Sequence, residues 1–419
     1  MKKIMELILK NQQESYNTLR LVASENMPGI SDRLPFMLDM FARYSFDDSS
    51  TWKYPTYYLN DIERETCGLF KQMLRCKHVS LKPISGLNGM LTTLAAFNQI
   101  GDTVMSLSPN SGGHLETAAI VQKLGMKSEF LPFDKNKWKI DVEKLKVRGN
   151  LEQIRMIYID LCMVAFPQPV RELRNILPKN TVVVYDASHV LGLILGDCFQ
   201  NPLEEGADIM IANTHKTFPG PHKAIFATNR KILKWQFDQM SGHFISHHHM
   251  ADVACLGLIA ERFSKEGFCK YASKVKENTR LLASLLFQSG VNVQLDHLNF
   301  TECHQIWIEC GGKEQVDQVI EICSKANIVI NGGLLPSLDG AWGIRIGTQE
   351  ITNKGIGEEG IHMLAEILSE AILQHHLSEE SLRKRDEIIT KHLNTVTEKR
   401  VTEDLIQLLS KNKDCEYHG

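Results

Sequence analysis

Two polar side chains stand at the ends of apolar runs, where a buried sheet would present them to a common ligand. Asp186 follows the run Val182–Tyr185, and Lys216 comes shortly after the run Ile209–Ile211. A buried carboxylate is costly unless a partner neutralises it, and a protonated pyridine nitrogen is a suitable partner. A lysine after a neighbouring strand can reach an aldehyde carbon on the same ring and form a Schiff base with it. The pair therefore predicts a pyridine-aldehyde cofactor held on Lys216, although a helix-capping aspartate and a solvated lysine would leave the same pattern.

The elements that would position this pair alternate between short β-branched runs and longer helical segments. Predicted strands are His78–Lys82, Thr103–Leu107, Lys127–Leu131, Met156–Leu161, Thr181–Tyr185, Ile209–Ile211 and Ala224–Ala227, and predicted helices are Gly89–Asn98, His114–Leu124, Val142–Arg148 and Val170–Leu177. This alternation, with nearly continuous apolar strands, indicates an α/β fold around a largely parallel sheet. Ligands of such sheets bind beyond the carboxyl ends of the strands, where Asp186 and Lys216 are expected.

The chain on either side of this region predicts further elements. Residues 1–20 have the apolar spacing of an amphipathic helix, which would pack on a partner subunit or cap the domain. A helical stretch from Ala251 to Ser289 leads to strands near Gln305–Glu309 and Ile328–Ile330, and residues 355–419 are mostly helical. We therefore expect an N-terminal helical arm over 1–20, a large domain over 21–275 and a small C-terminal domain with a helical tail over 276–419.

The composition narrows the classes of function. The chain has 419 residues, of which 43% are hydrophobic and 23% are charged, as in an ordinary globular protein. A formal net charge of −3 gives no sign of a nucleic-acid partner. The ten cysteines contain no C-x-x-C pair and fit a reducing cytoplasm better than a disulfide-stapled secreted domain. No run of the sequence approaches the roughly 20 apolar residues that a membrane span needs.

Several ordered segments resemble those of serine hydroxymethyltransferase and its relatives. The central segment runs from Val182 to Lys216 and carries Asp-x-x-His, Gly-Ala-Asp and Thr-His-Lys motifs. Shorter matches lie at Leu21–Asn26, Ser85-Gly86, Gly101–Val104, Gly112–His114 and Gly343–Thr348. The resemblance implies a fold-type I transferase that uses pyridoxal 5′-phosphate (PLP), with a mostly parallel seven-stranded sheet in a large domain and a smaller C-terminal α/β domain. It also implies a homodimer with shared active sites, acting on small amino acids and aldehydes.

The resemblance further implies roles for residues around the cofactor. Lys216 would form the Schiff base, with Thr214 and His215 beside it in the cofactor-binding segment. Asp186 would pair with the pyridinium nitrogen. His114 would stack on the face of the ring.

Other family positions would contact the edges of the cofactor and the substrate. His189 would lie against the 3-oxygen side of the cofactor, unless it is only a hydrogen-bonded core histidine. Backbone amides of the loop Ser85-Gly86-Leu87, which opens a helix, would bind the phosphate. Arg345 would grip the substrate carboxylate bidentately, and Ser24 would support the same group. The apolar, glycine-rich setting of Arg345 argues against a surface salt bridge.

The sequence departs from the family pattern where a loop should supply a glutamate. Counting without gaps from Tyr44 puts that glutamate at Phe46, and counting back from Tyr54-Pro55 puts it at Trp52. Neither side chain can carry the protons of serine cleavage and folate-linked transfer, although a shifted loop would bring in Asp47 or Asp48.

Two nearby positions add to this departure. Leu87 stands where the family's phosphate loop has a second hydroxyl donor. Tyr57 and Tyr58 look like the family's substrate-binding tyrosine pair, but their spacing from Pro55 is altered and ordinary aromatic packing would explain them equally well. Together with Phe46, these changes argue against the use of folate.

Three adjacent histidines, His247–His249, lie in the segment that a neighbouring subunit of the family lends to the phosphate. Adjacent residues of a regular element cannot all face one metal ion, so a metal site would need a loop. A polar rim of the active site and a solvated loop are the alternatives, and we expect no bound metal.

Asn213–Lys223 and Phe300–Gln305 resemble segments of L-threonine transaldolases, a branch of the same family. In that branch threonine loses acetaldehyde, and the resulting glycyl quinonoid attacks a second aldehyde without folate. The proton of the β-hydroxyl needs a base, for which His189, a water and His247–His249 are candidates. The rival interpretations are a folate-using serine hydroxymethyltransferase and a non-catalytic relative that keeps the fold as a binding or regulatory subunit.

Overall fold

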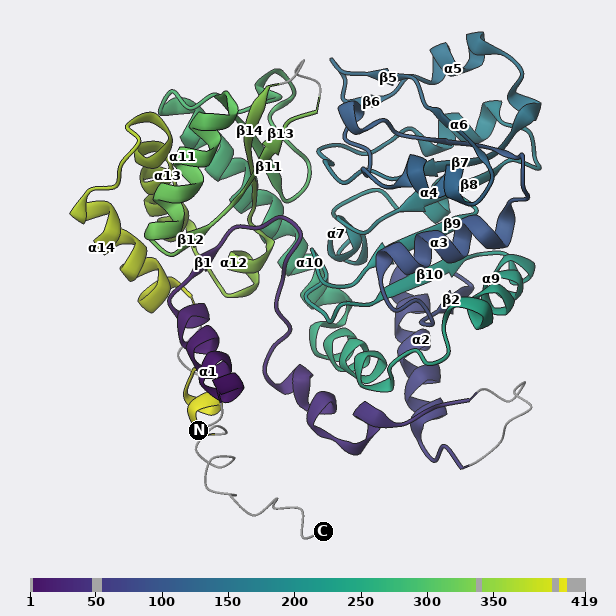
Figure 1. The fold of residues 1–419 in the computed structure, drawn as a ribbon, viewed down its shortest axis with the longest axis horizontal. Helices are drawn as coiled ribbons and strands as arrows, with labels where there is room; N and C mark the ends of the chain where they lie inside the picture. The colour runs from purple at the N-terminus through teal and green to yellow at the C-terminus, as the bar shows by residue number, and fades with distance from the viewer. Residues whose placement is uncertain (1–2, 47–54, 337–340, 394–398, 405–419) are drawn as a thin grey trace.

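The chain folds into two lobes that one long helix connects (Figure 1). The computed structural model describes residues 3–46, 55–336, 341–393 and 399–404. The larger lobe holds a seven-stranded sheet, and the smaller lobe holds a three-stranded sheet with helices packed against it. This confirms the predicted α/β fold with a large, mostly parallel sheet and a smaller C-terminal unit.

The large sheet has the strand order β2-β10-β9-β8-β7-β3-β4. Its strands are β2 (His78–Ser80), β3 (Thr103–Ser106), β4 (Lys127–Phe130), β7 (Ile154–Ile159), β8 (Val182–Asp186), β9 (Ile209–Asn213) and β10 (Ala224–Thr228). Strand β10 is antiparallel to both of its neighbours, and the other adjacent pairs are parallel. All seven predicted strands are present, and the carboxyl ends of β3, β7, β8 and β9 meet at one edge.

Both faces of this sheet are buried, which explains its nearly continuous apolar strands. Along β8, Val183 and Tyr185 enter one core, while Val182 and Val184 enter the other, because side chains alternate along a strand. Helices α3 (Gly86–Phe97), α4 (Thr117–Lys123) and α9 (Lys231–Phe244) contribute to the second core. The first core is covered by α2 (Leu59–Leu74), α5 (Val142–Arg148), α6 (Val170–Ile176), α7 (Leu191–Leu195), α8 (Pro202–Glu205) and α10 (Met250–Gln288).

Two helices that border the site begin at other residues than predicted. Helix α3 begins at Gly86, three residues early, because Ser85 caps it by accepting a hydrogen bond of 3.1 Å from the Asn88 amide. Helix α4 begins at Thr117, three residues late, because His114 lies in a turn whose amide donates to the Asp160 carbonyl.

The smaller lobe is built from segments at both ends of the chain. Its sheet joins β11 (Gln305–Gly311), β14 (Trp342–Gly347) and β13 (Asn331–Leu334) in antiparallel order. Strand β1 (Leu19–Arg20) pairs in parallel with β12 (Ile328–Val329), and Leu19 and Leu21 join the core of this lobe. The predicted helix over 1–20 is therefore too long, since α1 (Lys3–Tyr16) ends before β1.

The remaining elements complete the lobes. The small lobe carries α11 (Lys313–Lys325), α12 (Gln349–Asn353), α13 (Glu358–Leu373) and α14 (Glu379–Glu387), and the large lobe has a hairpin of β5 (Phe133–Asp134) and β6 (Lys139–Ile140). Short turns are η1 (Ser31–Met37), η2 (Asp39–Ala42), η3 (Pro109–Ser111), η4 (Leu151–Gln153), η5 (Asp296–Leu298) and η6 (Ile388–His392).

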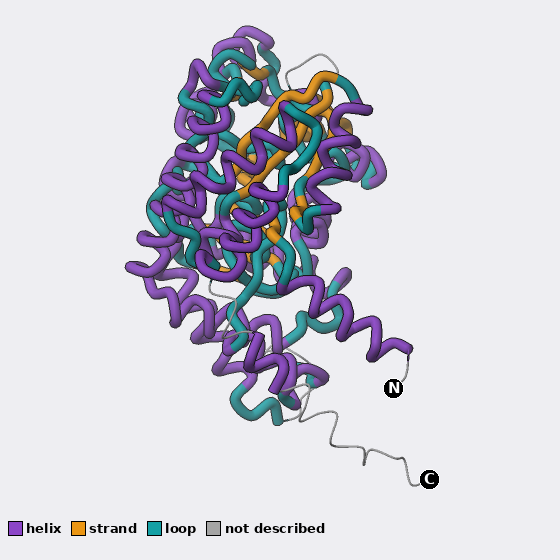
Figure 2. The backbone as a smooth tube through the Cα atoms, turned by 90° about the vertical axis from the view of Figure 1, so that its left-hand side faces the viewer, coloured by secondary structure: helices purple, strands orange, loops and turns teal. Residues whose placement is uncertain are grey.

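Helices α1 and α10 differ in how they relate to the lobes. Helix α1 projects from the body of the molecule (Figure 2), and none of its residues is buried. Helix α10 places Val253 and Val275 in the large core and Leu282 and Leu286 in the small core. Its helical backbone is interrupted at Ser264, where φ is 53°. The helix thus packs into the cores of both lobes and connects them.

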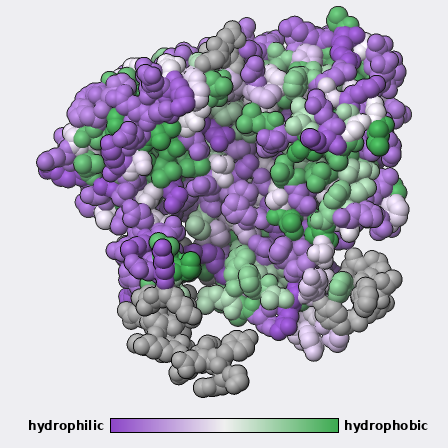
Figure 3. Space-filling view, viewed as in Figure 1, coloured by the Kyte–Doolittle hydropathy of each residue, from purple (hydrophilic) through white to green (hydrophobic). Residues whose placement is uncertain are grey.

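The surface mixes hydrophilic and hydrophobic side chains. On the face in Figure 3, hydrophobic patches are separated by hydrophilic residues. No helix in the described part of the chain is long and apolar enough to cross a membrane. All nine cysteines among the described residues are free thiols.

Candidate active site

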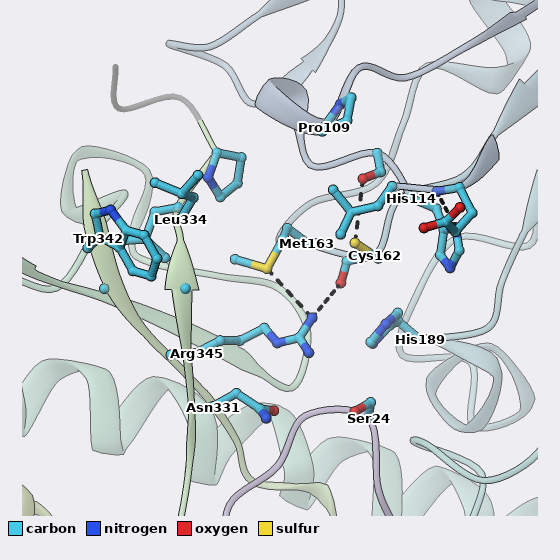
Figure 4. Close-up of a pocket in the computed structure, with 18 of the residues that line it drawn as sticks. Ser24, Pro109, His114, Cys162, Met163, His189, Asn331, Leu334, Trp342 and Arg345 are labelled. Carbon is cyan, nitrogen blue, oxygen red and sulfur yellow. Dashed lines mark hydrogen bonds between the residues drawn. The ribbon is translucent and has the colours of Figure 1, made fainter. Parts of the chain in front are cut away.

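Two adjoining cavities lie at the carboxyl ends of the parallel strands, where the lobes face one another. The wider cavity, of about 630 Å³, is lined by Met163 of the large lobe and by Arg345 and Trp342 of the small lobe (Figure 4). The narrower cavity reaches Asp186 and the first turn of α3. Four side chains line both cavities, namely His114, Cys162, His189 and Lys216.

The structure brings Asp186 and Lys216 together in the narrower cavity. Asp186 Oδ1 accepts a hydrogen bond of 2.9 Å from the Ser188 amide, and Oδ2 accepts a long one of 3.5 Å from the Tyr158 hydroxyl. No ion pair or hydrogen bond with another described residue engages the Lys216 amine. Burial lowers the pKa of Lys216, and Asp186 partly opposes this shift. An amine that gives up its proton more readily is a better nucleophile toward an aldehyde.

A glycine turn after β3 presents His114 to both cavities. Gly112 has a φ of +83°, and a Cβ atom on Gly113 would lie 2.2 Å from the Leu107 carbonyl oxygen, so the turn requires both glycines. The His114 amide donates to the Asp160 carbonyl at 3.1 Å, which fixes the backbone beside β7. Burial lowers the pKa of His114, so its ring is neutral at pH 7 and offers an uncharged aromatic face.

The first turn of α3 can bind an anion. The amides of Gly86 and Leu87 have no acceptor among the described residues, and both residues line the narrower cavity. Unpaired amides at a helix N-terminus favour phosphate and other anions. Ser85, by contrast, uses its hydroxyl oxygen to cap the helix, and the Leu87 side chain is half exposed.

Arg345 enters the wider cavity from the middle of β14. Its cross-strand neighbours are Trp307 and Asn331, and its Nη1 donates to the Cys162 carbonyl at 3.3 Å (Figure 4). No carboxylate of the described chain forms an ion pair with it. Burial lowers the pKa of Arg345, although the group stays protonated at any ordinary pH. A desolvated guanidinium without a counterion is a binding site for a carboxylate, and Ser24 lines the same cavity.

His189 follows β8 and is 3% exposed. Gln305 Nε2 lies 3.0 Å from its Nδ1, so the ring is a hydrogen-bonded buried histidine that also lines the cavities. Burial lowers the pKa of His189 well below its ordinary value, and the charges of Lys216 and Arg345 act in the same direction. The ring is therefore a hydrogen-bonded buried histidine, and its contact with the 3-oxygen side of the cofactor stays a prediction.

Thr214 and His215 lie beside Lys216 but outside the residues that line the two cavities. The Thr214 hydroxyl donates to the Pro221 carbonyl at 2.7 Å and closes the loop that carries Lys216. The His215 ring stacks on His222 with centroids 4.0 Å apart, and burial lowers its pKa to about 3. Their contribution to cofactor binding stays a prediction.

The structure does not bring the tyrosine pair to Lys216 within one chain. Tyr57 and Tyr58 are 84% and 78% exposed and line a separate cavity beside Leu38 and Arg43. Phe46 is half-buried, and its ring stacks on Tyr44 with centroids 5.9 Å apart. The alternative positions for the family's glutamate, Asp47, Asp48 and Trp52, fall outside the described residues.

The histidine run lies apart from the two cavities around Lys216. His248 Nε2 contacts Glu63 Oε2 at 3.0 Å, and the His247 ring packs on Tyr44 with centroids 4.7 Å apart. His248 lines another cavity, with Glu63 and Lys82. Across the described residues, no group of three histidine, cysteine or acidic side chains is placed to hold a metal ion.

Several lining residues were not anticipated from the sequence. Cys162 and Met163 follow β7, so the rule that ligands bind beyond strand ends would have found them. Trp342 and Asn331 stand on strands that were not predicted. Gln305 begins the predicted strand β11, but its contact with His189 was not anticipated. Their participation depends on how the small lobe meets the large one.

Comparison with known proteins gives consistent matches along the chain. A family model described as serine hydroxymethyltransferase matches residues 1–368. The serine hydroxymethyltransferase of Archaeoglobus fulgidus is 33% identical over 405 residues, which cover 94% of this chain and 91% of that protein. The corresponding protein of Methanosphaera stadtmanae is 32% identical and covers 85% of this chain and 86% of its own length. Among solved structures, an L-threonine transaldolase from Pseudomonas fluorescens in its internal aldimine state superimposes with a TM-score of 0.88 at 25% identity, covering 97% of this chain and 96% of that chain.

Proposed function

The chain belongs to the serine hydroxymethyltransferase family, and from this premise we propose that it acts as a threonine transaldolase. It is a PLP-dependent transferase. In the proposed reaction the Cα–Cβ bond of threonine breaks, acetaldehyde leaves, and the remaining glycyl unit is transferred to a second aldehyde. The product is a β-hydroxy-α-amino acid, and folate takes no part.

The narrower cavity suits PLP by the chemistry of its lining. When bound, PLP draws the electrons of a bond at the amino acid α-carbon into its protonated ring. Asp186 would keep the ring nitrogen protonated, the Lys216 amine would bind the aldehyde carbon, and the amides of Gly86 and Leu87 would hold the phosphate. The unpaired Lys216 amine and the unpaired amides of α3 support this assignment.

The wider cavity would orient the amino acid. Arg345 would bind its carboxylate, with Ser24 beside it, because a desolvated guanidinium without an acidic partner among the described residues is stabilised by that charge. His114 would offer its neutral ring face to the cofactor. Holding the carboxylate at Arg345 and the amine near Lys216 fixes the α-carbon between two points, which lowers the entropic cost of reaching the reactive conformation.

Phe46 is the observation that favours transaldolase over hydroxymethyltransferase activity. It stands at one of the two positions counted for the family's glutamate, and its carbonyl accepts a hydrogen bond of 3.1 Å from Asn60. An apolar ring at this position cannot carry the protons of folate-linked transfer. The likeness to a solved L-threonine transaldolase over nearly the whole of both chains also supports the proposal.

A folate-using serine hydroxymethyltransferase is the second candidate. The relatives from Archaeoglobus and Methanosphaera bear that name and match most of this chain, which favours this second candidate. The two candidates share the cofactor, the lysine and the carboxylate site. They differ in the reaction partner of the glycyl unit, which is a second aldehyde in one case and a folate-linked group in the other.

Parallel assays separate the two candidates. The PLP-loaded chain is offered threonine with an aromatic aldehyde in one assay and serine with tetrahydrofolate in the other. We expect acetaldehyde release and a β-hydroxy-α-amino acid in the first assay, with no folate-dependent loss of serine in the second. Turnover in the second assay alone would overturn the proposal.

We also propose that two copies of the chain share their active sites. The exposed Tyr57 and Tyr58 support this, because within one chain they lie away from the cavities that contain Lys216. Mixing an inactive Lys216→Ala chain with an inactive Tyr58→Ala chain would restore activity if each partner supplies what the other lacks.

We further propose a reducing compartment such as the cytoplasm, which the free cysteines of the described chain support.

A further inference from the structure

Gln305 connects buried groups of both lobes behind the His189 ring. It is the first residue of β11, and its Nε2 lies 3.0 Å from His189 Nδ1 and 3.1 Å from the Cys162 carbonyl oxygen. Its Oε1 lies 3.2 Å from Trp307 Nε1. Gln305, His189 and Trp307 are 1%, 3% and 4% exposed, so bulk water does not compete for these contacts.

The contacts with the Cys162 carbonyl and the Trp307 indole nitrogen decide which way the Gln305 amide is turned. The Cys162 carbonyl can only accept a hydrogen bond, and the Trp307 indole nitrogen can only donate one. Turning the amide over would set an oxygen against the carbonyl and an N–H against the indole, which would lose both bonds. The amide nitrogen has two protons, and the Cys162 carbonyl and His189 Nδ1 are the two acceptors that use them.

We propose that Gln305 is a positioning residue that keeps His189 neutral, with its single ring proton on Nε2. Because Nδ1 faces an N–H donor, it can only accept a hydrogen bond. A second ring proton on Nδ1 would set two donors against each other in a buried place.

The groups around His189 act in the same direction. Lys216 and Arg345 carry positive charge toward the ring, and His304 and His215 would do so if protonated. The His304 ring stacks on His189 with centroids 5.6 Å apart and planes 19° apart. Asp186, three residues earlier in the chain, accepts from the Ser188 amide. Burial and charge therefore support the neutral form that the hydrogen bonds require.

This arrangement excludes His189 as the acceptor of the β-hydroxyl proton. Nε2, the nitrogen that remains for the cavity, already carries a proton and has no partner among the described residues, so it acts as a donor. Nδ1 is occupied by Gln305. This second part of the proposal rests on the retro-aldol reaction proposed above, whereas the placement of the ring proton does not.

The placement of the proton can be measured without any turnover. NMR of the holoenzyme with isotope-labelled histidine distinguishes the Nε2–H ring, the Nδ1–H ring and the doubly protonated ring, and His189→Asn identifies the signal. We expect a neutral Nε2–H ring that stays unchanged from about pH 8 to about pH 6, although an ordinary histidine titrates in that range. A ring protonated on Nδ1, or one that titrates there, would overturn the proposal.

Substitutions at Gln305 test whether the amide is the cause. In Gln305→Glu the new carboxylate accepts from Nδ1–H, so we expect a doubly protonated ring. In Gln305→Leu the donor is lost, and His189 should change tautomer or titrate. Gln294→Leu, on a nearby segment that bonds to Trp307 and Glu309, is the matched control and should leave the signal unchanged. If Gln305→Leu does not fold, Trp307→Phe frees the amide to turn and should broaden or shift the signal. An unchanged neutral ring in Gln305→Glu would contradict the proposal.

The exclusion of His189 as a base has its own test. His189→Asn keeps an N–H donor but cannot take up a proton at neutral pH. Loss of a general base costs about 10²–10⁴-fold in rate, so we expect acetaldehyde release to fall by less than about 10-fold with the cofactor absorbance retained. A loss in the larger range, with the absorbance retained, would make His189 the base. If wild-type chain releases no acetaldehyde, the proposed function fails while the NMR result stands.

Discussion

The two sides of the candidate active site are built in different ways. In the large-lobe wall, which we define as Lys216, Asp186 and His114, Lys216 and His114 stand in loops beyond the ends of parallel strands, and Asp186 is the last residue of β8. The small-lobe wall, which we define as Arg345, Trp342 and Asn331, stands on the strands themselves. Loops at strand ends can be reshaped without disturbing a sheet, whereas strand positions are tied to the register of their neighbours.

From this difference we expect the two walls to have separate functions. The large-lobe wall contains the groups that suit a cofactor, and the small-lobe wall contains the groups that suit the substrate. A change in the first should remove the cofactor signal and every activity together. A change in the second should keep the cofactor signal and alter only what the enzyme accepts. The following predictions test this division, from the largest expected effect to the smallest.

Lys216→Ala should abolish the function of the large-lobe wall. We expect the visible absorbance of the covalently held cofactor to vanish and the rate to fall by at least about 10³-fold, as when a covalent nucleophile is removed. Absorbance spectra and acetaldehyde release measure the two effects. Lys234→Ala is the control, since Lys234 is paired with Asp238 on α9. A retained signal that borohydride can reduce would move the Schiff base to another lysine.

Arg345→Gln should weaken substrate binding without affecting cofactor binding. The substrate carboxylate loses a charged hydrogen-bonding partner, which costs about 2–5 kcal/mol, or roughly 30-fold to 5,000-fold in kcat/KM. Most of the change should appear as a higher KM for threonine, with the cofactor absorbance unchanged. Arg280→Gln, which removes a hydrogen bond to the Thr301 carbonyl in the small lobe, is the matched control. Loss of the cofactor signal in Arg345→Gln would break the proposed division.

Trp342→Ala should affect the acceptor aldehyde more than the amino acid. Removing an apolar surface from a binding cavity costs about 1–3 kcal/mol, so KM for an aromatic aldehyde should rise by about 10-fold or more. Rates with benzaldehyde and with propanal as acceptors measure the effect, since acetaldehyde as acceptor would only rebuild threonine. The exposed Trp235, on α9, provides the same substitution outside the cavities. Equal losses for both aldehydes would mean that Trp342 does not contact the acceptor.

The smallest expected effect, over one pH unit, concerns stability at the buried His304, whose ring stacks on His189. Burial lowers the pKa of His304 from 6.5 to about 3. Between these values the unfolded chain binds a proton and the folded chain does not, so the free energy of unfolding falls as the pH drops below 6.5. The contribution of this one side chain is about 1 kcal/mol per pH unit.

Urea unfolding at several pH values tests this linkage. We expect a shallower fall of the free energy of unfolding in His304→Gln than in the wild-type chain below pH 6.5. His297→Gln, at an exposed histidine, is the control for replacing a histidine by glutamine. Identical slopes in His304→Gln and the wild-type chain would contradict the low pKa of His304.

The large lobe could be predicted in detail because its sheet is buried on both faces. The central strands β7, β8 and β9 are then short apolar runs, and the runs that end at Tyr185 and Ile211 locate Asp186 and Lys216 directly. The predicted start of α4 was wrong because His114 lies in a turn whose amide donates to the Asp160 carbonyl, so the helix begins only at Thr117.

In the small-lobe sheet, β11 was predicted by the same rules, but β13 and β14 were not. Strand β13 contains adjacent glycines, which usually indicate a turn, yet a Cβ atom on Gly332 would lie 2.4 Å from the Val316 side chain of α11. Glycine is present there because a helix packs closely on the strand. Residues such as Gln305 and Trp342 gain a role only when this sheet meets the large lobe. Their contacts depend on positions far apart in the sequence, which periodicity does not reveal.

The pairing of β1 with β12 has a consequence for how the protein is made. Leu19 lies opposite Ile328, 309 positions later in the chain (328 − 19), and the Leu21 carbonyl accepts a hydrogen bond from the Gly347 amide. During synthesis the amino-terminal segment leaves the ribosome first, but it can pair with β12 only after most of the chain has been made. Ser24, which follows β1 closely, can likewise reach its position in the cavity only then. The large lobe can therefore fold while translation continues, but the substrate cavity is closed only when the last strands of the small lobe arrive.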